Sequence, residues 1–446
     1  MNQIIREGKT KKIMMADMPE HVIIESKDDI TAGDGAKRDV ISGKGELANL
    51  TTSNVFRFLK ACGLPVVAFI KEIDETRFLA ERCKMIPLEL VVRREAHGSF
   101  LHRHPHLQEG DFFPALLFEC FAKTNDKIWR KNRSIPMDDP FLDLSDDSVK
   151  FYRPHWTDAQ KKESEQTGFK GFLVGQKPFL LIPRQDFFPV IGSTEEDFIK
   201  MKRIAKQTFL ILEKAWQLLG RRLVDFKVEC GVNMHGELRL ADVIDNDSWR
   251  VIDDEKHISK QLYRDGADIN EVTAKYRLVA ELTGKFGLPR QQIILWRASE
   301  SDDLTDFKDA FRTYNTRGSD FETCKMRTVT YSLHKEPVLA CEAIGKLVQE
   351  VPDSVVIVYC GRNNGAGPTL SAQCTVPVIT VPATWREFPE DVWSSLRTPS
   401  ETPVMTVFDP KNAILAALQI LAMQNPELYA SLRIKQEERF LNFVRI

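Results

Sequence analysis

Charged residues alternate with apolar ones in the segment Asp225-Phe226-Lys227-Val228-Glu229. If this segment forms a strand, the three charged side chains share one face and the two apolar side chains face a core. Charged groups on such a strand are costly unless they meet a ligand, a metal or one another. Asp242, at the end of the next apolar segment, could add a carboxylate oxygen for Mg²⁺, which usually binds one or two carboxylates plus phosphate oxygens. The pattern favours Mg²⁺ and nucleotide chemistry over the alternative of a structural salt-bridge network.

A lysine-rich segment near the N-terminus, Glu7-Gly8-Lys9-Thr10-Lys11-Lys12, is a second candidate for phosphate binding. It is not a P-loop, because the first glycine of that motif would have to stand where the chain has Gln3. A hairpin here could still place backbone amides and ammonium groups over a triphosphate. The alternative is a solvated basic turn, since runs of charge usually lie exposed to water.

Histidine and cysteine spacing gives no strong sign of a metal site. His102, His104 and His106 alternate, but Pro105 interrupts them and no acidic residue adjoins. The eight cysteines form no Cys-x-x-Cys pair, which disfavours a disulfide framework, a zinc site and a redox motif. We expect these cysteines to be reduced and mostly buried.

The elements that must position these groups follow from the spacing of apolar residues. In the first part of the chain, short apolar runs bounded by turn residues predict strands at 22–24, 65–70, 88–92, 172–174, 224–228 and 238–243. Helical spacing predicts helices over 45–61 and 195–219. Residues 123–176 are polar and contain three prolines, so we expect a long, irregular surface excursion there. The first part is therefore predicted to have an α+β fold.

The pattern changes near residue 288, after a predicted helix at 269–285 that ends at Gly287-Leu288-Pro289. Beyond it, predicted strands and helices alternate: strands at 293–296, 328–331, 354–359, 376–381 and 404–407, and helices at 304–314, 338–348 and 412–423. This alternation predicts a three-layer α/β domain with a parallel sheet and a ligand site at the carboxyl ends of its strands. We expect domains at 1–265 and 290–446, joined by a linker helix at 266–289.

Composition excludes several classes of protein. The 446 residues include 62 Lys plus Arg and 64 Asp plus Glu, a formal net charge of −2, whereas a protein that grips nucleic acid by phosphate neutralisation would carry a basic excess. The longest apolar runs fall short of the roughly 18 residues that a bilayer span needs, and the N-terminus does not have the pattern of a secretory signal. We expect a cytoplasmic protein that binds small molecules rather than nucleic acid or membranes.

Nine segments of the sequence, in order, match two known families. The segments are EGKTK at 7–11, ITAGDGAKR at 30–38, VVRREAHGSF at 91–100, DFKVECG at 225–231, ADVIDNDSWR at 241–250, SESD at 299–302, SLHK at 332–335, GRNNGAGP at 361–368 and DVWSSLR at 391–397. Through the first five, residues 1 to about 265 resemble phosphoribosylaminoimidazole-succinocarboxamide synthase (SAICAR synthetase), an ATP-dependent ligase of purine synthesis. Through the last four, residues 290–446 resemble the phosphoribosylaminoimidazole (AIR) carboxylase domain that animals fuse behind this ligase.

The resemblance implies a chemistry for the first domain. ATP activates the carboxylate of carboxyaminoimidazole ribotide (CAIR) as an acyl phosphate, and the amino group of L-aspartate then attacks. Lys9 and Lys11 would hold the ATP phosphates, Lys227 would lie near the nucleotide, and Glu229 and Asp242 would bind Mg²⁺. The extended segment from Glu89 to Val91 would lie against adenine.

The resemblance also implies a set of substrate-binding residues in this domain, namely Arg93, Ser99, Asp247 and Arg250, with Asp34 on the substrate side of the site. Lys123 and Asp139 correspond to catalytic positions of the family, although about a dozen residues are inserted between them, near 127–137. A second insertion is expected near 177–194. Because both lie near the expected substrate cleft, altered substrate control or altered assembly is an open possibility.

For the second domain, the resemblance implies addition of CO₂ to a ring carbon of AIR without biotin or ATP, with His334 transferring the proton. The implied binding residues are Ser299, Ser301, Asp302, Ser332, Lys335, Gly361, Arg362, Asn364 and Gly365. Three positions depart from the family pattern, because Ala298 and Glu336 replace glycines and Leu333 replaces a small residue. A Cβ can close a site where backbone must approach phosphate, and a bulkier side chain can fill a small pocket. The alternative is therefore a retained fold that serves only oligomerisation.

The sequence thus predicts a ligase that joins L-aspartate to CAIR, fused to a domain that carboxylates AIR. Three alternatives stay open: a ligase with an inactive oligomerisation domain, a pathway scaffold without activity, and a ligase that uses another amine donor. The resemblance also implies a homo-octamer built around the carboxylase domains.

Overall fold

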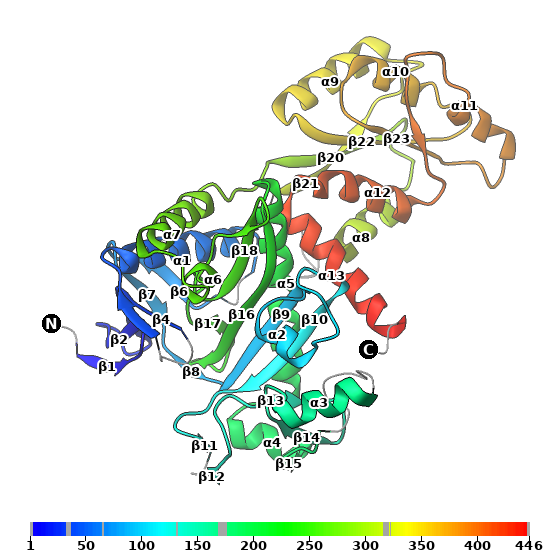
Figure 1. Cartoon of the computed structure of the whole chain (residues 1–446). Helices are drawn as coiled ribbons and strands as arrows, with labels where there is room; N and C mark the ends of the chain where they lie inside the picture. Colours follow the sequence, from blue (N-terminus) through cyan, green and yellow to red (C-terminus); the bar gives the residue numbers. More distant parts are fainter. Residues whose placement is uncertain are drawn as a thin grey trace. The chain divides into compact units, whose positions relative to one another are not determined.

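The computed structural model describes residues 3–32, 37–64, 67–130, 133–167, 176–314, 321 and 323–443. Its internal contacts divide the chain into two compact units (Figure 1). The first comprises most residues up to Phe286, and the second comprises Gly287–Glu438 together with Ala61–Gly63. Each unit has its own sheets and its own hydrophobic cores.

The first unit begins with a small antiparallel sheet. In spatial order its strands are β1 (Ile4–Glu7), β2 (Lys11–Met15), β3 (His21–Ser26), β7 (Arg77–Glu81) and β6 (Phe69–Glu72). The lysine-rich segment forms the β1–β2 hairpin, in which Gly8 N donates to Lys11 O at 2.8 Å. Strands β4 (Asp29–Ala32) and β5 (Lys37–Val40) pair separately. The strand predicted at 22–24 lies within β3, and the one predicted at 65–70 overlaps β6.

A larger sheet carries most of the candidate residues. In spatial order it contains β15 (Leu180–Pro183), β14 (Ser148–Tyr152), β13 (Phe141–Asp143), β10 (Phe112–Ala122), β9 (Leu88–Glu95), β16 (Arg222–Asn233), β18 (Trp249–Asp253) and β19 (Lys256–His257). Strands β17 (Leu238–Ala241) and β8 (Cys83–Met85) also pair with β16. The strands predicted at 88–92, 224–228 and 238–243 correspond to β9, β16 and β17. Because β16 pairs with four strands, it brings distant segments of the chain together (Figure 1).

Helices α1 (Lys44–Ala61) and α5 (Glu195–Leu218) confirm the two helices predicted for this part of the chain. The Thr194 side chain accepts a hydrogen bond from Asp197 N at 3.0 Å, and three acidic residues in the first turn of α5 suit the positive end of the helix dipole. Helix α7 (Ile269–Thr283), in the segment expected to be a linker, packs Val272 and Tyr276 against Ile30. The shorter helices are α2 (Ser99–Arg103), α3 (Asp158–Thr167), α4 (Arg184–Ile191) and α6 (Gln261–Arg264).

The segment 123–176 is more regular than its composition predicted. Strands β13 and β14 extend the large sheet, β15 follows at its edge, and β11 (Ile128–Trp129) pairs with β12 (Arg133–Ser134). The buried rings of Trp129, Phe151 and Phe187 pack together. The prediction of an irregular excursion is wrong here because each strand is too short to show a clear alternating pattern. The strand predicted at 172–174 lies outside the described residues.

The second unit contains a parallel sheet, which confirms the predicted α/β class. In spatial order its strands are β21 (Cys324–Thr330), β20 (Gln291–Arg297), β22 (Asp353–Cys360), β23 (Val378–Pro382) and β24 (Met405–Thr406). The connecting helices are α8 (Thr305–Tyr314), α9 (Pro337–Glu350), α10 (Ala366–Gln373) and α12 (Pro410–Ala422), followed by α13 (Pro426–Phe443). A short 3-10 helix, η2 (Pro389–Val392), leads into α11 (Trp393–Leu396). Two apolar clusters form the core of the second unit.

The cysteines match the sequence-based expectation. No disulfide joins any of the eight, all of which are among the described residues, and five are buried: Cys62, Cys120, Cys230, Cys324 and Cys360. Among the described residues, no helix has both the length and the apolar character that a membrane span requires.

Candidate functional site

The charged face of β16 has the predicted alternation. Phe226 and Val228 are buried, whereas Lys227 is exposed and Glu229 is half-buried. Glu229 lies opposite Ala241 on β17. Asp242 directly follows Ala241, so its backbone lies near that of Glu229. The pairing of β16 with β17 therefore brings the backbones of the two residues expected to bind Mg²⁺ close together.

Three lysines and three carboxylates gather around this end of β16. We call them the lysine–carboxylate cluster: Lys11, Lys123, Lys227, Glu89, Glu229 and Asp242. Lys123 Nζ lies 3.0 Å from Glu229 Oε1 and 3.6 Å from Glu89 Oε2. Lys227 Nζ lies 3.0 Å from the same Glu89 oxygen. Lys11 forms an ion pair with Asp242.

The charges in this cluster stabilise one another. Burial raises the pKa of Glu89, but the positive charges of Lys227 and Lys123 outweigh it and hold this pKa below its ordinary value. Burial opposes the charge of Lys123, but Glu229 and Glu89 raise the pKa of Lys123 overall. Both groups therefore stay ionised at neutral pH. A polyanion that binds here must replace these carboxylates as the ion-pair partner of the lysines.

A second group of charged residues lies nearer the start of β16. We call it the buried arginine network: Arg93, Arg103, Arg250, Glu119 and Asp225. Arg93 Nε donates to Glu119 Oε2 at 2.7 Å, and Arg93 also pairs with Asp225. Asp225 accepts from Arg250 Nη1 at 2.7 Å, and Glu119 also binds Arg103. Burial opposes the charge of Arg93, but Glu119 and Asp225 raise the pKa of Arg93 above its ordinary value. Arg93 is buried between Glu119 and Asp225, so its guanidinium stabilises the fold through these two ion pairs.

A glycine directly before Ser99 lies against the Arg250 guanidinium. Gly98, at the start of α2, has a φ of 57°, and a Cβ at this position would lie 2.1 Å from Arg250 Nη2. Only a residue without a Cβ allows the guanidinium to lie across this turn. Ser99 follows directly and is half-buried.

Asp247 lies in a third charged group, most of which sequence reasoning missed. Its carboxylate accepts from Tyr276 Oη at 2.6 Å and lies 3.3 Å from Lys260 Nζ and 3.6 Å from Lys44 Nζ. Burial raises the pKa of Asp247, but Lys44 and Lys260 together lower it to about 2. The run of acidic residues at 242–247 was the one available signal, because so many carboxylates require nearby cations. The sequence did not indicate which cations these are.

The other predicted residues of the first unit are more dispersed. Lys9 is exposed in the β1–β2 hairpin, and Val91 is buried in β9 opposite Lys227. Asp139 is exposed and accepts a hydrogen bond from Thr124 N at 3.0 Å, which ties it to the residue after Lys123. Asp34 lies outside the described residues.

The described basic residues of this domain do not form a cleft whose acidic counterparts face water. Instead Glu89, Glu229, Glu119 and Asp225 are buried or half-buried against those same basic residues. The reason is the desolvation cost, since a charged side chain removed from water requires an opposite charge nearby.

In the second unit, the candidate residues lie at the carboxyl ends of the parallel strands. The loops at 299–302, 332–335 and 361–365 follow β20, β21 and β22, respectively. In the first loop, Ser299 Oγ lies 2.8 Å from Ser301 Oγ, and Ser299 N donates to Asp302 Oδ2 at 2.9 Å. Ser332 and Lys335 flank His334 in the second loop. Ligand sites of parallel sheets form at this edge.

His334 is placed against the third loop. A Cβ at Gly365 would lie 2.8 Å from His334 Nε2, so the missing side chain of Gly365 leaves room for the imidazole. Asn364 shapes the loop, because its Oδ1 accepts from Gly367 N at 2.9 Å and its Nδ2 donates to Ser395 Oγ at 3.0 Å. Ser395 belongs to α11, in the segment DVWSSLR.

The remaining residues of this loop are held by the segment after β23. Arg362 N donates to Thr384 Oγ1 at 2.8 Å, and Arg362 has a φ of 56°. A Cβ at Gly361 would lie 3.1 Å from the Thr384 side chain. The glycine-rich loop is therefore packed closely against its neighbours.

The three departures from the family pattern each have contacts that accommodate them. Leu333 packs against the apolar cluster that contains Trp296 and Leu370, so it does not require space in the loop. The Glu336 carboxylate accepts a hydrogen bond from Ser332 N at 3.5 Å and thus turns towards its own loop. Ala298 also packs against the apolar cluster.

Comparison with known proteins adds an independent line of evidence. The SAICAR synthetase family model matches residues 4–136 and 181–281, and the AIR carboxylase family model matches residues 293–440. A Caenorhabditis elegans protein named probable multifunctional protein ADE2 is 34% identical over 453 residues, which cover 99% of this chain and 95% of that protein.

Two further matches come from a human protein and a solved structure. The human protein, named bifunctional phosphoribosylaminoimidazole carboxylase/phosphoribosylaminoimidazole succinocarboxamide synthetase, is 32% identical over 439 residues, which cover 96% of this chain and 92% of that protein. A solved SAICAR synthetase in complex with ADP is 27% identical with a TM-score of 0.46, covering 62% of this chain and 96% of that one.

Proposed function

The chain belongs to the bifunctional SAICAR synthetase/AIR carboxylase family of purine biosynthesis, and from this premise we propose where each reaction takes place. The first unit ligates L-aspartate to CAIR with ATP and Mg²⁺, giving SAICAR, ADP and phosphate. The second unit carboxylates AIR to CAIR. The observation that carries the ligase assignment is the lysine–carboxylate cluster, where groups for a metal and groups for phosphate lie within contact of each other.

The donor set of this cluster fits Mg²⁺. Glu229 pairs with Ala241, the residue before Asp242, and hard carboxylate oxygens are the ligands that Mg²⁺ uses together with phosphate oxygens and water. When bound, Mg²⁺ neutralises the charge that develops on the transferred phosphate.

We propose that Lys11, Lys123 and Lys227 exchange their carboxylate partners for ATP phosphates, with Lys9 in reach from the β1–β2 hairpin. The carboxylate oxygen of CAIR attacks the terminal phosphorus, forming an acyl phosphate and releasing ADP. The aspartate amine then forms the new C–N bond, and phosphate leaves with the C–O bond electrons. Preorganised cations at the phosphates supply most of the stabilisation that such a transfer needs.

Substrate positioning in this proposal uses the second and third charged groups. Arg250, with Ser99 beside it, would bind the ribotide phosphate, while Arg93 fixes Arg250 indirectly through Asp225. Asp247 orients Lys260 and Lys44 in the adjoining group. Asp34, Asp139 and the segment from Glu89 to Val91 keep the roles that the family resemblance implies.

In the second unit we propose that His334 moves the proton of the carboxylation. A C–C bond forms between CO₂ and the ring carbon of AIR, and the proton on that carbon leaves to His334. The loops at 299–302, 332–335 and 361–365 would hold the ribotide, since they meet at the carboxyl edge of the sheet. The inward packing of Leu333 supports activity over a purely scaffolding role.

We further propose a cytoplasmic homo-octamer with domains at 1–265 and 290–446, joined by the segment 266–289. Light scattering tests the assembly, because an octamer of 51.0 kDa chains is readily distinguished from a monomer or dimer.

The ligase assignment is tested by incubating the protein with CAIR, L-aspartate and MgATP. We expect SAICAR, ADP and phosphate in equal amounts, and no SAICAR when Mg²⁺ is chelated. Parallel reactions with other amino acids test the amine donor. ADP formation without an amide product would contradict the assignment, and no turnover at all would favour the scaffold alternative.

A further inference from the structure

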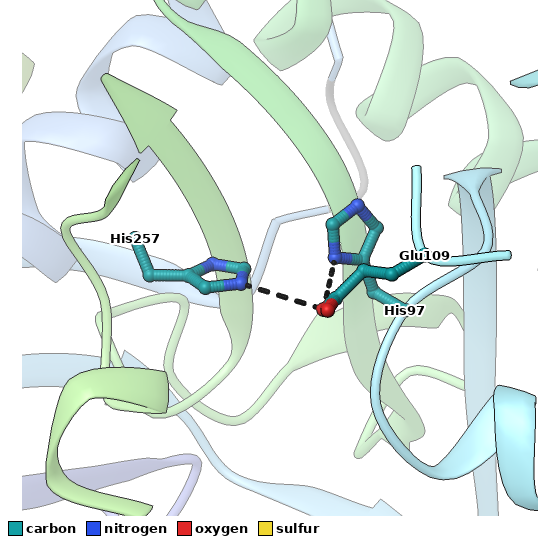
Figure 2. A group of neighbouring side chains, drawn as sticks. All are labelled: His97, Glu109 and His257. Atoms are coloured by element: carbon teal, nitrogen blue, oxygen red, sulfur yellow. Dashed lines mark hydrogen bonds and ion pairs between the residues drawn. The ribbon is translucent and has the colours of Figure 1, made fainter. Parts of the chain in front are cut away.

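Two histidines and one glutamate outside the lysine–carboxylate cluster face one another in the first unit. His97 follows β9, Glu109 precedes β10, and His257 is the last residue of β19. Figure 2 shows the Glu109 carboxylate between the two imidazole rings. Glu109 Oε1 lies 3.0 Å from His97 Nδ1 and 3.9 Å from His257 Nε2. All three ligand atoms lie within 4.8 Å of one another.

We propose that His97, Glu109 and His257 form a binding site for a divalent transition-metal ion of the zinc class. Zinc binds imidazole nitrogen and carboxylate oxygen at about 2.0 to 2.2 Å, which places the ligands of a tetrahedral site roughly 3.3 to 3.6 Å apart. The two observed separations from Glu109 lie on either side of this range. Small side-chain movements therefore suffice to close the site around an ion.

His97 is held in the orientation that a ligand needs. It is buried, and its Nε2 lies 3.2 Å from Glu95 Oε2 while its Nδ1 faces Glu109. Glu95 is itself bound by Arg222 Nε at 3.2 Å. A carboxylate on the far nitrogen of a histidine fixes the ring and increases its basicity as a ligand, as in many metal sites.

His257 is not held by a competing hydrogen bond at its second nitrogen. Its Nδ1 is buried and has no hydrogen-bond partner among the described residues. Its Nε2 is the nitrogen that faces Glu109, and it is the one that would bind the ion.

The surroundings of the three residues favour a cation. They line a cavity of about 490 Å³ together with Arg222, Glu255, Gln261 and Asp265. The charged side chains of this lining are three carboxylates and one guanidinium, since Glu109 belongs to it as well. The cavity also leaves room for water or a small ligand at a fourth coordination position.

The donor types separate this site from the proposed Mg²⁺ site. Two imidazoles and one carboxylate suit zinc and its neighbours, whereas Mg²⁺ prefers oxygen donors alone. The proposed site would also tie together segments used in the ligase proposal. His97 is two residues before Ser99, and His257 lies on the strand paired with β18, which carries Arg250.

The test is a titration of the metal-stripped full chain with Co²⁺ in the presence of excess Mg²⁺, which occupies the oxygen-donor site. We expect one Co²⁺ per chain to bind with the strong visible absorption of a four-coordinate site with nitrogen ligands, and one equivalent of Zn²⁺ to abolish that absorption. His97→Asn and His257→Asn should weaken Co²⁺ binding roughly 100-fold or more, and Glu95→Gln should weaken it about 10- to 100-fold.

His235→Asn is the matched control, because this exposed histidine lies in the β16–β17 turn away from the three residues. Glu109→Gln covers the case that a histidine variant fails to fold, since the Glu109 side chain is 61% exposed. Absorption that is absent in the wild-type chain, or that persists in Glu109→Gln and in a folded histidine variant, would overturn the proposal. Because the readout is metal binding, it does not depend on the ligase proposal.

Discussion

Asp242 and Glu229 each contact a lysine that we propose to bind phosphate. This arrangement explains how so many charges are accommodated in the absence of a basic excess. It also predicts that removing a carboxylate at the proposed Mg²⁺ site lowers activity, whereas removing one in the buried arginine network lowers stability.

Asp242→Asn removes one proposed Mg²⁺ ligand but keeps the shape of the side chain. We expect ligase kcat to fall by about 10² to 10³-fold, the usual effect of deleting one electrostatic group at a reacting centre. Asp254→Asn is the control, because Asp254 is exposed and has a positive φ, as Asp242 does. Steady-state ADP release measures both variants, and wild-type turnover by Asp242→Asn would refute the assignment.

Glu119→Gln tests the buried arginine network separately from catalysis. It leaves Arg103 and one side of Arg93 buried without a negative partner, which typically costs about 3 to 5 kcal/mol. Glu237→Gln removes an exposed pair with Arg239 and should cost roughly 0 to 1 kcal/mol. Thermal unfolding of the first unit compares the two variants, and equal melting temperatures would contradict the structural role.

Asp247 should make the stability of the first unit depend on pH. The pKa of Asp247 is lowered from its ordinary value of 3.8 to about 2. At pH values above 3.8 its ion pairs therefore add roughly 2 kcal/mol to the free energy of unfolding, and this contribution is lost as the pH falls from about 4 to 2. Asp247→Asn lacks the contribution at every pH. The difference in melting temperature between wild type and variant should therefore shrink as the pH approaches 3, and a constant difference would argue against it.

At the level of elements, the carboxyl edge of the parallel sheet depends on one close approach. Gly365→Ala should displace His334, because the new Cβ would lie 2.8 Å from Nε2. We expect AIR carboxylation to fall about 10- to 100-fold, since misplacing a catalytic group by an ångström has effects of this size.

Gly345→Ala is the matched control for this substitution. Gly345 lies within α9, and a Cβ there has no atom within 4 Å among the described residues, so we expect unchanged activity and a stabilisation of about 0.5 to 1 kcal/mol. Equal carboxylase activity in the two variants would show that His334 is not positioned by Gly365.

The sequence predicted elements well where the apolar pattern was long. Strands β20 and β22 have continuous apolar runs, and helices α1 and α5 have apolar residues at helical spacing. The described strands between Lys123 and Glu195 have two to five residues each, too few to show a period. Their burial depends on aromatic contacts such as Trp129 with Phe187, which sequence spacing does not reveal.

At the level of the whole molecule, the sequence singled out most of the charged residues that gather around β16 but not their ion-pair partners. Glu229 was predicted from the alternating pattern of 225–229, and Asp242 from its place at the end of the next apolar segment. Lys44, Lys260 and the group of His97, Glu109 and His257 were missed, since the members of each group come from distant segments and carry no recognisable spacing. Ion pairs of this kind depend on strand register, which the sequence left undetermined.

The most direct test of the central claim is a single reaction of the full chain with AIR, bicarbonate, L-aspartate and MgATP, followed by chromatography of SAICAR. We predict that SAICAR forms from AIR through CAIR. His334→Ala should stop SAICAR formation from AIR and leave its formation from added CAIR unchanged. If the wild-type chain makes no SAICAR from AIR while it does so from CAIR, the claim that both units are active is contradicted.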